Sequence, residues 1–195
     1  MTAESDALYF HRLVSALGPN EDGLSDDEVA DIEARYGFTF PPDLRALLQY
    51  CVPVSRHTNG FPDWRRDSDE LRWRLAEPVE GVVGDLEQLP NWWPVPGERP
   101  SNLDEAKAVA REYFRQQPKL IPVFSHRYLP STPCESGNPV FSVMQSDIIY
   151  YGYNLQDYFR REFNLPLKSS EEEKLRHIQF WGDIVEQVDQ FETYG

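Results

Sequence analysis

The sequence predicts an α+β fold, with one domain over residues 1–195 and a central antiparallel β-sheet flanked by N-terminal and C-terminal helices. Three observations lead to this prediction. Short runs of β-branched and aromatic residues at 120–124, 139–144 and 148–151 are typical of strands. Segments with helical spacing of apolar residues precede and follow these runs. The chain has no internal repeat, and its 40% hydrophobic content is enough for one core.

The middle of the sheet is expected in the strand-forming runs. Leu120–Phe124 predicts the first strand, and a polar loop from Ser125 to Asn138 follows it. Pro139–Met144 and Ile148–Tyr151 lie close enough along the chain to predict a β-hairpin. Successive side chains of a strand point to opposite faces, and both sets in the first of these two runs are largely apolar. We therefore expect this strand to be covered on both faces.

The N-terminal part of the chain contains the clearest helix signals. A short helix is expected over Asp6–Leu17. Ser25 and Glu28 have the spacing of a capping box, and Gly37 offers a left-handed exit, so a helix is predicted between them. A further helix is expected to begin at Pro42, because proline is favoured in the first helical turn.

The middle of the chain mixes irregular and regular segments. We expect no regular structure from Val52 to Asp69 and a helical turn or two over Leu71–Leu75, stopped by Pro78. The β-branched run Val79–Val83 predicts a strand. Asn102–Gln117 predicts an amphipathic helix whose inward side chains are Ala106, Val109, Ala110, Tyr113 and Phe114.

Two helical segments are expected after the sheet. Asn154 is a good N-cap for a helix that carries Leu155 on its buried side. A further segment is expected to begin at Ser169 or Ser170, with Gly182 as a candidate break.

Acidic residues dominate the charge. The chain has 33 Asp and Glu against 19 Lys and Arg, a net charge of −14. This excess argues against nucleic acid or an anionic membrane as a partner, because phosphate contacts need clustered basic residues. It suits a basic protein partner, although solubility alone also explains it. The N-terminus has acids where a signal peptide needs bases, and no apolar run reaches the ~18 residues of a membrane span, so we expect a cytoplasmic protein.

Metal and cofactor signatures are missing from the sequence. The four histidines are far apart, and Cys51 and Cys134 are isolated, which is poor material for a zinc site. The sequence also lacks a phosphate-binding glycine loop, a nucleophile elbow and a dinucleotide fingerprint. We therefore predict no metal and no cofactor.

Ser125-His126-Arg127-Tyr128, directly after a predicted strand, is the most site-like cluster. Histidine can act as a base near neutral pH. Adjacent Ser and His side chains in a strand point to opposite faces, however, so they form a dyad only if the backbone turns. The alternative is structural: His126 and Arg127 tie down the following loop by hydrogen bonds.

Two further groups are candidates for a site. Asp85 and Glu87 lie two residues apart beside the predicted strand Val79–Val83, where paired carboxylates could act in acid–base chemistry or could simply be solvated. Tryptophans interleaved with proline could line an exposed binding groove, since Trp is frequent at interface hot spots, or could belong to the core: Trp64, Trp73, Trp92 and Trp93.

Several segments carry a resemblance to a known family. LSDDEVADIEARYGFTFPPDLRALLQY, residues 24–50, resembles the opening of the Smi/Knr-type domains of the SUKH superfamily, with an acidic helix, a glycine and a second helix. The resemblance continues through the first strand, the hairpin and the helix after it. Further segments resemble an uncharacterised bacterial subgroup: Gly60–Arg65, Ser125–Tyr128 and Phe180–Ile184.

The resemblance implies an α+β fold and, by analogy, a protein-binding role without catalysis. Bacterial members commonly act as immunity proteins that neutralise secreted toxins, and fungal relatives connect to cell-wall synthesis and signalling. We therefore expect a non-enzymatic immunity-type protein that binds a basic toxin domain. The expected contact residues are Asp85, Glu87, Trp92, Trp93, His126, Arg127 and Tyr128.

Two alternatives stay open. The first is a small-molecule-binding protein or enzyme, which requires five side chains to converge in one cleft: Asp85, Glu87, His126, Arg127 and Tyr128. The second is an adaptor that joins regulatory complexes, as the fungal relatives suggest.

Overall fold

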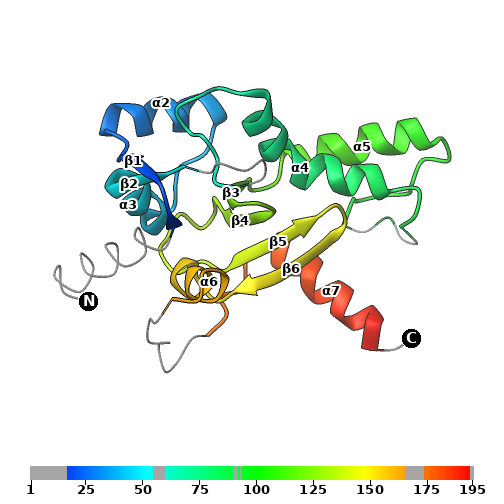
Figure 1. Cartoon of the computed structure of the whole chain (residues 1–195). Helices are drawn as coiled ribbons and strands as arrows, with labels where there is room; N and C mark the ends of the chain where they lie inside the picture. The colour runs from blue at the N-terminus through cyan, green and yellow to red at the C-terminus, as the bar shows by residue number, and fades with distance from the viewer. Residues whose placement is uncertain (1–16, 55–59, 90–91, 93, 166–173, 194–195) are drawn as a thin grey trace.

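The computed structural model describes residues 17–54, 60–89, 92, 94–165 and 174–193, and it has a mixed α+β fold (Figure 1). The main sheet is a four-stranded meander in which each strand is antiparallel to the next, in the order β3-β4-β5-β6. The α+β prediction is confirmed. The strands are β3 (Leu120–Phe124), β4 (Arg127–Pro130), β5 (Val140–Met144) and β6 (Asp147–Gly152).

The N-terminal helices begin and end as the sequence predicts. Helix α2 (Asp26–Tyr36) has the capping box, in which the Ser25 hydroxyl accepts from the Glu28 amide at 3.2 Å. It ends at Gly37, whose φ of 64° is left-handed. Helix α3 (Pro42–Tyr50) begins at proline and leads into a two-stranded antiparallel sheet made of β1 (Asn20–Asp22) and β2 (Cys51–Pro53). Of the helix predicted over residues 6–17, all but the last residue lies outside the described residues.

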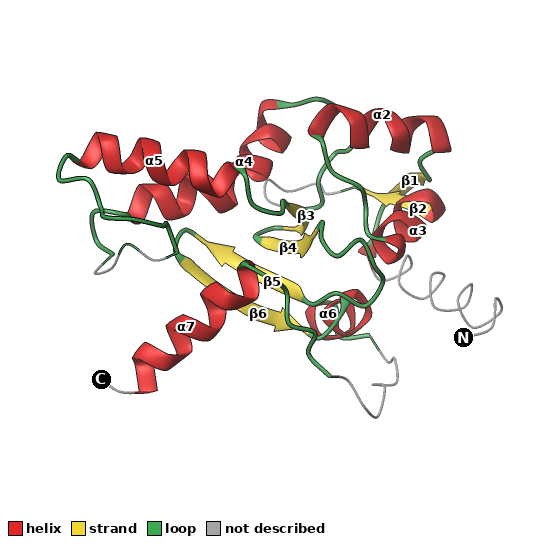
Figure 2. Ribbon diagram, turned by 180° about the vertical axis from the view of Figure 1, so that it is seen from behind, coloured by secondary structure: helices red, strands yellow, loops and turns green. Residues whose placement is uncertain are grey.

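Both faces of the main sheet are covered. Val140 of β5 belongs to a core cluster that also includes side chains of α2, α3 and α6 (Leu155–Glu162). Its neighbour Phe141 belongs to a second cluster, with side chains of α5 (Leu103–Arg115) and α7 (Trp181–Thr193). Figure 2 shows α7 lying across β5 and β6. The expectation that this strand is buried on both sides is confirmed.

The strand predicted over Val79–Val83 is wrong, because these residues belong to helix α4 (Asp69–Asp85). Pro78, which was expected to stop the helix, is buried inside it. A proline has no amide to donate to the carbonyl four residues earlier, here that of Arg74. The Tyr128 hydroxyl donates to this carbonyl at 3.1 Å, so a neighbouring strand supplies the missing donor. Burial of the valines against the sheet then favours the helix over their β propensity.

The loop predicted from Ser125 to Asn138 is also wrong in part, because it contains β4, which pairs with β3 and β5. The helix predicted over Asn102–Gln117 is present as α5, capped by the Asn102 side chain. Val109, expected to point inward, is 42% exposed.

The C-terminal helices follow the prediction less closely. Helix α6 begins after Asn154, whose side chain accepts from the Asp157 amide at 2.8 Å, as expected. The expected start of the last segment at Ser169 or Ser170 lies outside the described residues, and residues 174–180 are not helical. Gly182 does not break the helix but lies in the first turn of α7, where a Cβ atom would come within 2.3 Å of the Tyr150 hydroxyl. Close contact with β6 explains the glycine.

None of the helices that the structure describes combines the length and the apolar character needed to cross a membrane.

Candidate functional site

The candidate site is built around the turn between β3 and β4. Phe124 and Arg127 pair across the two strands, so Ser125 and His126 are the two central residues of a tight turn. Ser125 has a φ of 50°, as the first central residue of a primed hairpin turn requires. The backbone thus turns as a Ser–His dyad would need, and Ser125 Oγ lies 3.0 Å from His126 Nδ1.

Helix α4 fixes the position of this turn through a buried arginine. Arg74, whose side chain is 2% exposed, donates from Nη1 to the Gly60 carbonyl at 2.6 Å and from Nη2 to Glu70 at 3.0 Å. The Ser125 amide donates to the same Gly60 carbonyl at 3.0 Å. One backbone oxygen therefore joins the helix to the turn.

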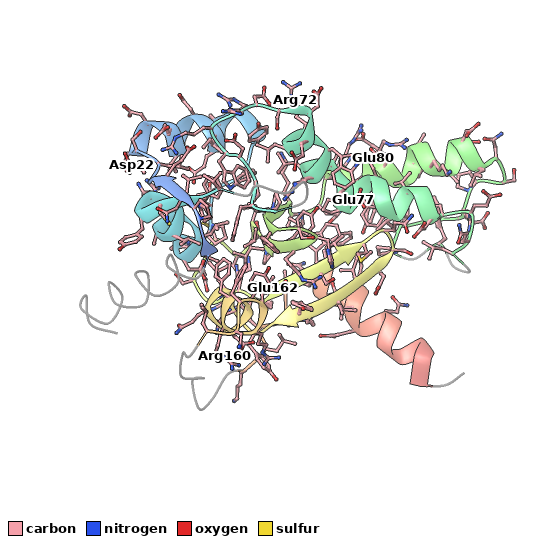
Figure 3. The ribbon with its side chains drawn as sticks, viewed as in Figure 1. Asp22, Arg72, Glu77, Glu80, Arg160 and Glu162 are labelled. Carbon is pink, nitrogen blue, oxygen red and sulfur yellow. The ribbon has the colours of Figure 1, made fainter. Side chains whose placement is uncertain are left out.

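A cavity of about 340 Å³ lies between α4, this turn and the end of β5. We call it the His126 cavity, and its lining includes Trp73, Glu77, His126, Tyr128 and Met144. Trp73 and Met144 are each 56% exposed, although both are large apolar side chains. Figure 3 labels Glu77 on α4, one turn before Glu80. The cavity therefore combines a carboxylate and an imidazole with an apolar, solvent-exposed rim.

Burial controls the charge of the cavity. It lowers the pKa of His126, and the neighbouring Arg127 guanidinium acts in the same direction, while Glu162 opposes them. Burial also raises the pKa of Glu77. A hydrogen bond from the Gln145 backbone lowers this pKa, and the charge of Asp85 raises it. The imidazole is thus held in its neutral, hydrogen-bond-accepting form near neutral pH.

Asp85 and Glu87 do not line this cavity. Asp85 is the last residue of α4 and does not follow a strand over Val79–Val83, and its carboxylate caps the turn between β5 and β6. It accepts from the Ser146 amide at 3.1 Å and from the Ser146 hydroxyl at 2.7 Å. Glu87 is exposed just beyond the helix.

The cluster Ser125-His126-Arg127-Tyr128 is divided between the two faces of the sheet. Tyr128 lies on the cavity side and donates to the Arg74 carbonyl. Arg127 lies on the opposite face, where Nη1 donates to Ser142 Oγ at 2.5 Å and the guanidinium carbon is 3.5 Å from the centre of the Tyr151 ring. The five side chains that the enzyme alternative requires therefore do not converge in one cleft.

The described tryptophans do not share one groove. Trp64 is buried in the core with its ring edge-on to Phe40, and Trp92 is half-buried against the cluster on the α5 and α7 side. Trp73 alone among these three is exposed at the cavity rim. Trp93 lies outside the described residues.

Glu77 and Met144 are site residues that the sequence reasoning missed. A helix continuing through Pro78 would have placed Trp73 and Glu77 four residues apart on one face. Because the sequence predicts that the helix stops at Pro78 and that a strand follows, this spacing does not point to a site. Across the part of the chain that the structure describes, no group of three or more His, Cys, Asp or Glu side chains could hold a metal ion.

Comparisons with protein-family models, with curated proteins and with solved structures gave no match. The geometry of the cavity and its surroundings therefore carries the functional interpretation.

Proposed function

We propose that this chain is a cytoplasmic, non-enzymatic binding protein of the immunity type, which blocks a basic toxin domain. Its resemblance to the SUKH superfamily and its net charge of −14 support the proposal. The observation that carries it is the exposed pair Trp73 and Met144 beside a cavity that contains the Glu77 carboxylate.

The charge distribution suits a basic partner. Exposed acids such as Asp22, Asp27 and Asp31 lie around β1 and α2 (Figure 3 labels Asp22). Opposite fields accelerate association between two proteins. Arg45 and Arg65 pair with other acids of this region, but no described cation forms an ion pair with Asp22, Asp27 or Asp31.

The His126 cavity offers an anchor for a Lys or Arg side chain of that partner. The face of an exposed Trp73 can stack on a cation, and Glu77 can pair with its charge. Met144 adds an adaptable apolar contact at the rim. Tryptophan anchors at the centre of an interface often account for a large share of the binding energy.

The first experiment is co-expression with candidate toxin domains encoded near this gene, with cell growth as the readout. Protection by the wild-type chain is expected, and the association rate with the matching domain should fall steeply with added salt. Trp73→Ala should weaken binding at least about tenfold, as for an interface hot spot. Val109→Ala, which truncates another exposed apolar side chain, on α5, is the matched control.

Three outcomes would contradict the proposal. A screen of the neighbouring genes that finds no toxin argues against the immunity role. Stable binding of housekeeping proteins instead would favour the adaptor alternative. If Trp73→Ala and the wild type bound the partner with equal affinity, Trp73 would not be the anchor proposed at the cavity.

The enzyme alternative is favoured by one contact, the 3.0 Å approach of Ser125 Oγ to His126 Nδ1 at the cavity. A histidine can take the proton of a serine nucleophile, but it is usually oriented by a third group. Among the described residues, no carboxylate hydrogen-bonds to the His126 ring. Hydrolysis of p-nitrophenyl acetate that disappears in both Ser125→Ala and His126→Ala would favour the enzyme over the binding protein.

A further inference from the structure

A second hollow lies on the other side of α4 from the His126 cavity. It has a volume of about 290 Å³, and we call it the Lys119 groove. One wall is a stripe of α4 that includes Leu75, Ala76 and Val79. Its other apolar lining comes from α5, β3 and the first residue of α7, through Phe114, Leu120 and Trp181.

The apolar lining of the groove is held in place by a specific contact. The Trp181 indole donates from Nε1 to the Pro118 carbonyl at 2.6 Å, which ties the start of α7 to the connection between α5 and β3. Trp181 also packs against Phe114, with ring centres 6.2 Å apart. Three separate segments thus form a defined apolar surface, which is typical of a ligand site.

Cations outnumber acids around the Lys119 groove. Its charged lining residues are Arg72, Arg115 and Lys119 against Glu80 alone. Glu80 is already engaged with Nε of Arg111, at 2.9 and 3.0 Å, so Arg115 approaches it only to 3.4 Å. The Lys119 ammonium donates to the Tyr36 carbonyl, which leaves its charge without a carboxylate partner among the described residues.

This local excess of positive charge is notable because the whole chain carries −14. A groove formed only by gaps in apolar packing would be expected to share the acidic surroundings of the rest of the surface. Among the described residues, Lys119 has no carboxylate partner, and Arg115 has only the 3.4 Å contact with Glu80, a carboxylate that Arg111 holds more closely. Such a combination suits a ligand with one anionic end and one apolar end.

We propose that the Lys119 groove binds a small amphiphile with a carboxylate head and an apolar tail. The tail lies along the α4 stripe, with the buried Phe114 and Trp181 side chains as the floor of the groove, and the carboxylate meets Lys119 and Arg115 at the rim. Arg72 is less available, because Asp67 holds its guanidinium through two hydrogen bonds. A volume near 300 Å³ is at the small end of ligand pockets, so the ligand has a short tail.

The test compares three probes with the same eight-carbon chain: octanoate, octan-1-ol and octylammonium. Binding is followed by amide and indole chemical shifts of the full chain, with the Trp181 Nε1–H signal as the reporter for the groove. Octanoate is expected to bind tightest. The net charge of the protein would favour octylammonium, so a preference for octanoate has to come from the local cations.

Matched variants locate the site. Lys119→Gln should weaken octanoate about two- to fivefold, the range of an exposed ion pair, and leave octan-1-ol unchanged. Lys107→Gln removes the same charge from α5, outside the groove, and should leave both unchanged. Ala76→Trp places a large side chain at an exposed helix position within the groove and should abolish binding of both probes without unfolding the chain.

Three results would overturn the proposal. They are the absence of octanoate-induced shifts at Trp181, octanoate binding no tighter than octylammonium, and equal effects of the two lysine substitutions. None of them bears on the toxin-binding function, which is assigned to the other side of α4.

Discussion

The two sides of α4 differ in the contacts that their side chains make. On the His126 side, a buried Arg74 and the Tyr128 hydroxyl make polar contacts that position the β3–β4 turn and the sheet. On the Lys119 side, the helix contributes an apolar stripe, and its polar contacts are ion pairs at the surface, such as that between Arg72 and Asp67. One side of the same helix is fixed by buried hydrogen bonds and the other is left open.

The difference shows how one helix can border two cavities of different character. Buried polar groups must be satisfied, so contacts on the His126 side specify one arrangement of helix and strands. That fixed arrangement allows the other side to present an unfilled apolar surface. We therefore expect stability to depend on the His126 side, while substitutions on the Lys119 side change ligand binding and leave the fold intact.

Two arginines that lie two residues apart on α4, Arg72 and Arg74, provide the largest expected contrast. Arg74→Ala removes a buried guanidinium and its bonds to Gly60 and Glu70, and should lower the free energy of unfolding by about 3 kcal/mol. Arg72→Ala removes a side chain that is 58% exposed and should cost less than about 1 kcal/mol. Urea unfolding followed by circular dichroism measures both values.

The two arginine variants share helix, residue type and replacement, so propensity cancels between them. Equal destabilisation would mean that buried polar contacts do not distinguish the two sides of α4. A smaller cost for Arg74→Ala than for Arg72→Ala would reverse the comparison.

The next contrast concerns Pro78 and the carbonyl that it leaves without a helical donor. Tyr128→Phe removes the hydroxyl that donates to the Arg74 carbonyl and should cost about 1 to 2 kcal/mol of unfolding free energy. In a Pro78→Ala background the same change should cost less, because the alanine amide can donate to that carbonyl. A double-mutant cycle measures the coupling. If the effects of the two substitutions on the free energy of unfolding were additive, Tyr128 would not compensate for the proline.

The sequence predicted the features that depend on residues close together in the chain, such as the starts of two helices. Ser25 and Glu28 lie three residues apart, and Pro42 is favoured at a helix start by its own φ, so both helix starts were readable from sequence. Pro78 was misread because its compensating partner, Tyr128, lies fifty residues away along the chain. A short stretch of sequence around Pro78 therefore does not include the residue that supplies the missing donor.

The candidate site was predicted only in part for the same reason. His126 was singled out, but Asp85 was placed beside a strand that is in fact the end of α4. Glu77 and Met144 could be found only by knowing that the helix continues and that the β5–β6 turn meets it. Both facts depend on tertiary contacts rather than on periodicity.

The smallest expected effect is the pH response of His126. Burial and Arg127 lower its pKa below the ordinary value of about 6.5, so just below that pH the unfolded chain binds a proton that the folded chain does not. Stability from this group is therefore fully present above the ordinary pKa and is lost as pH falls through the folded pKa. An NMR titration of the ring should show a pKa below the ordinary value, and His126→Gln should remove this part of the pH dependence.

His177 is the internal control, because a hydrogen bond to Glu186 raises its pKa, so it should titrate above the ordinary value.

The charge of the His126 cavity, where Glu77 also titrates, changes as the solution is acidified from neutrality. The lining of the Lys119 groove includes no histidine, and a hydrogen bond from Arg111 lowers the pKa of its one carboxylate, Glu80. Acidification should therefore weaken binding of a basic partner at the cavity while leaving octanoate in the groove unaffected, as long as octanoate itself stays ionised. If both affinities changed together, the two sides of α4 would be coupled rather than independent.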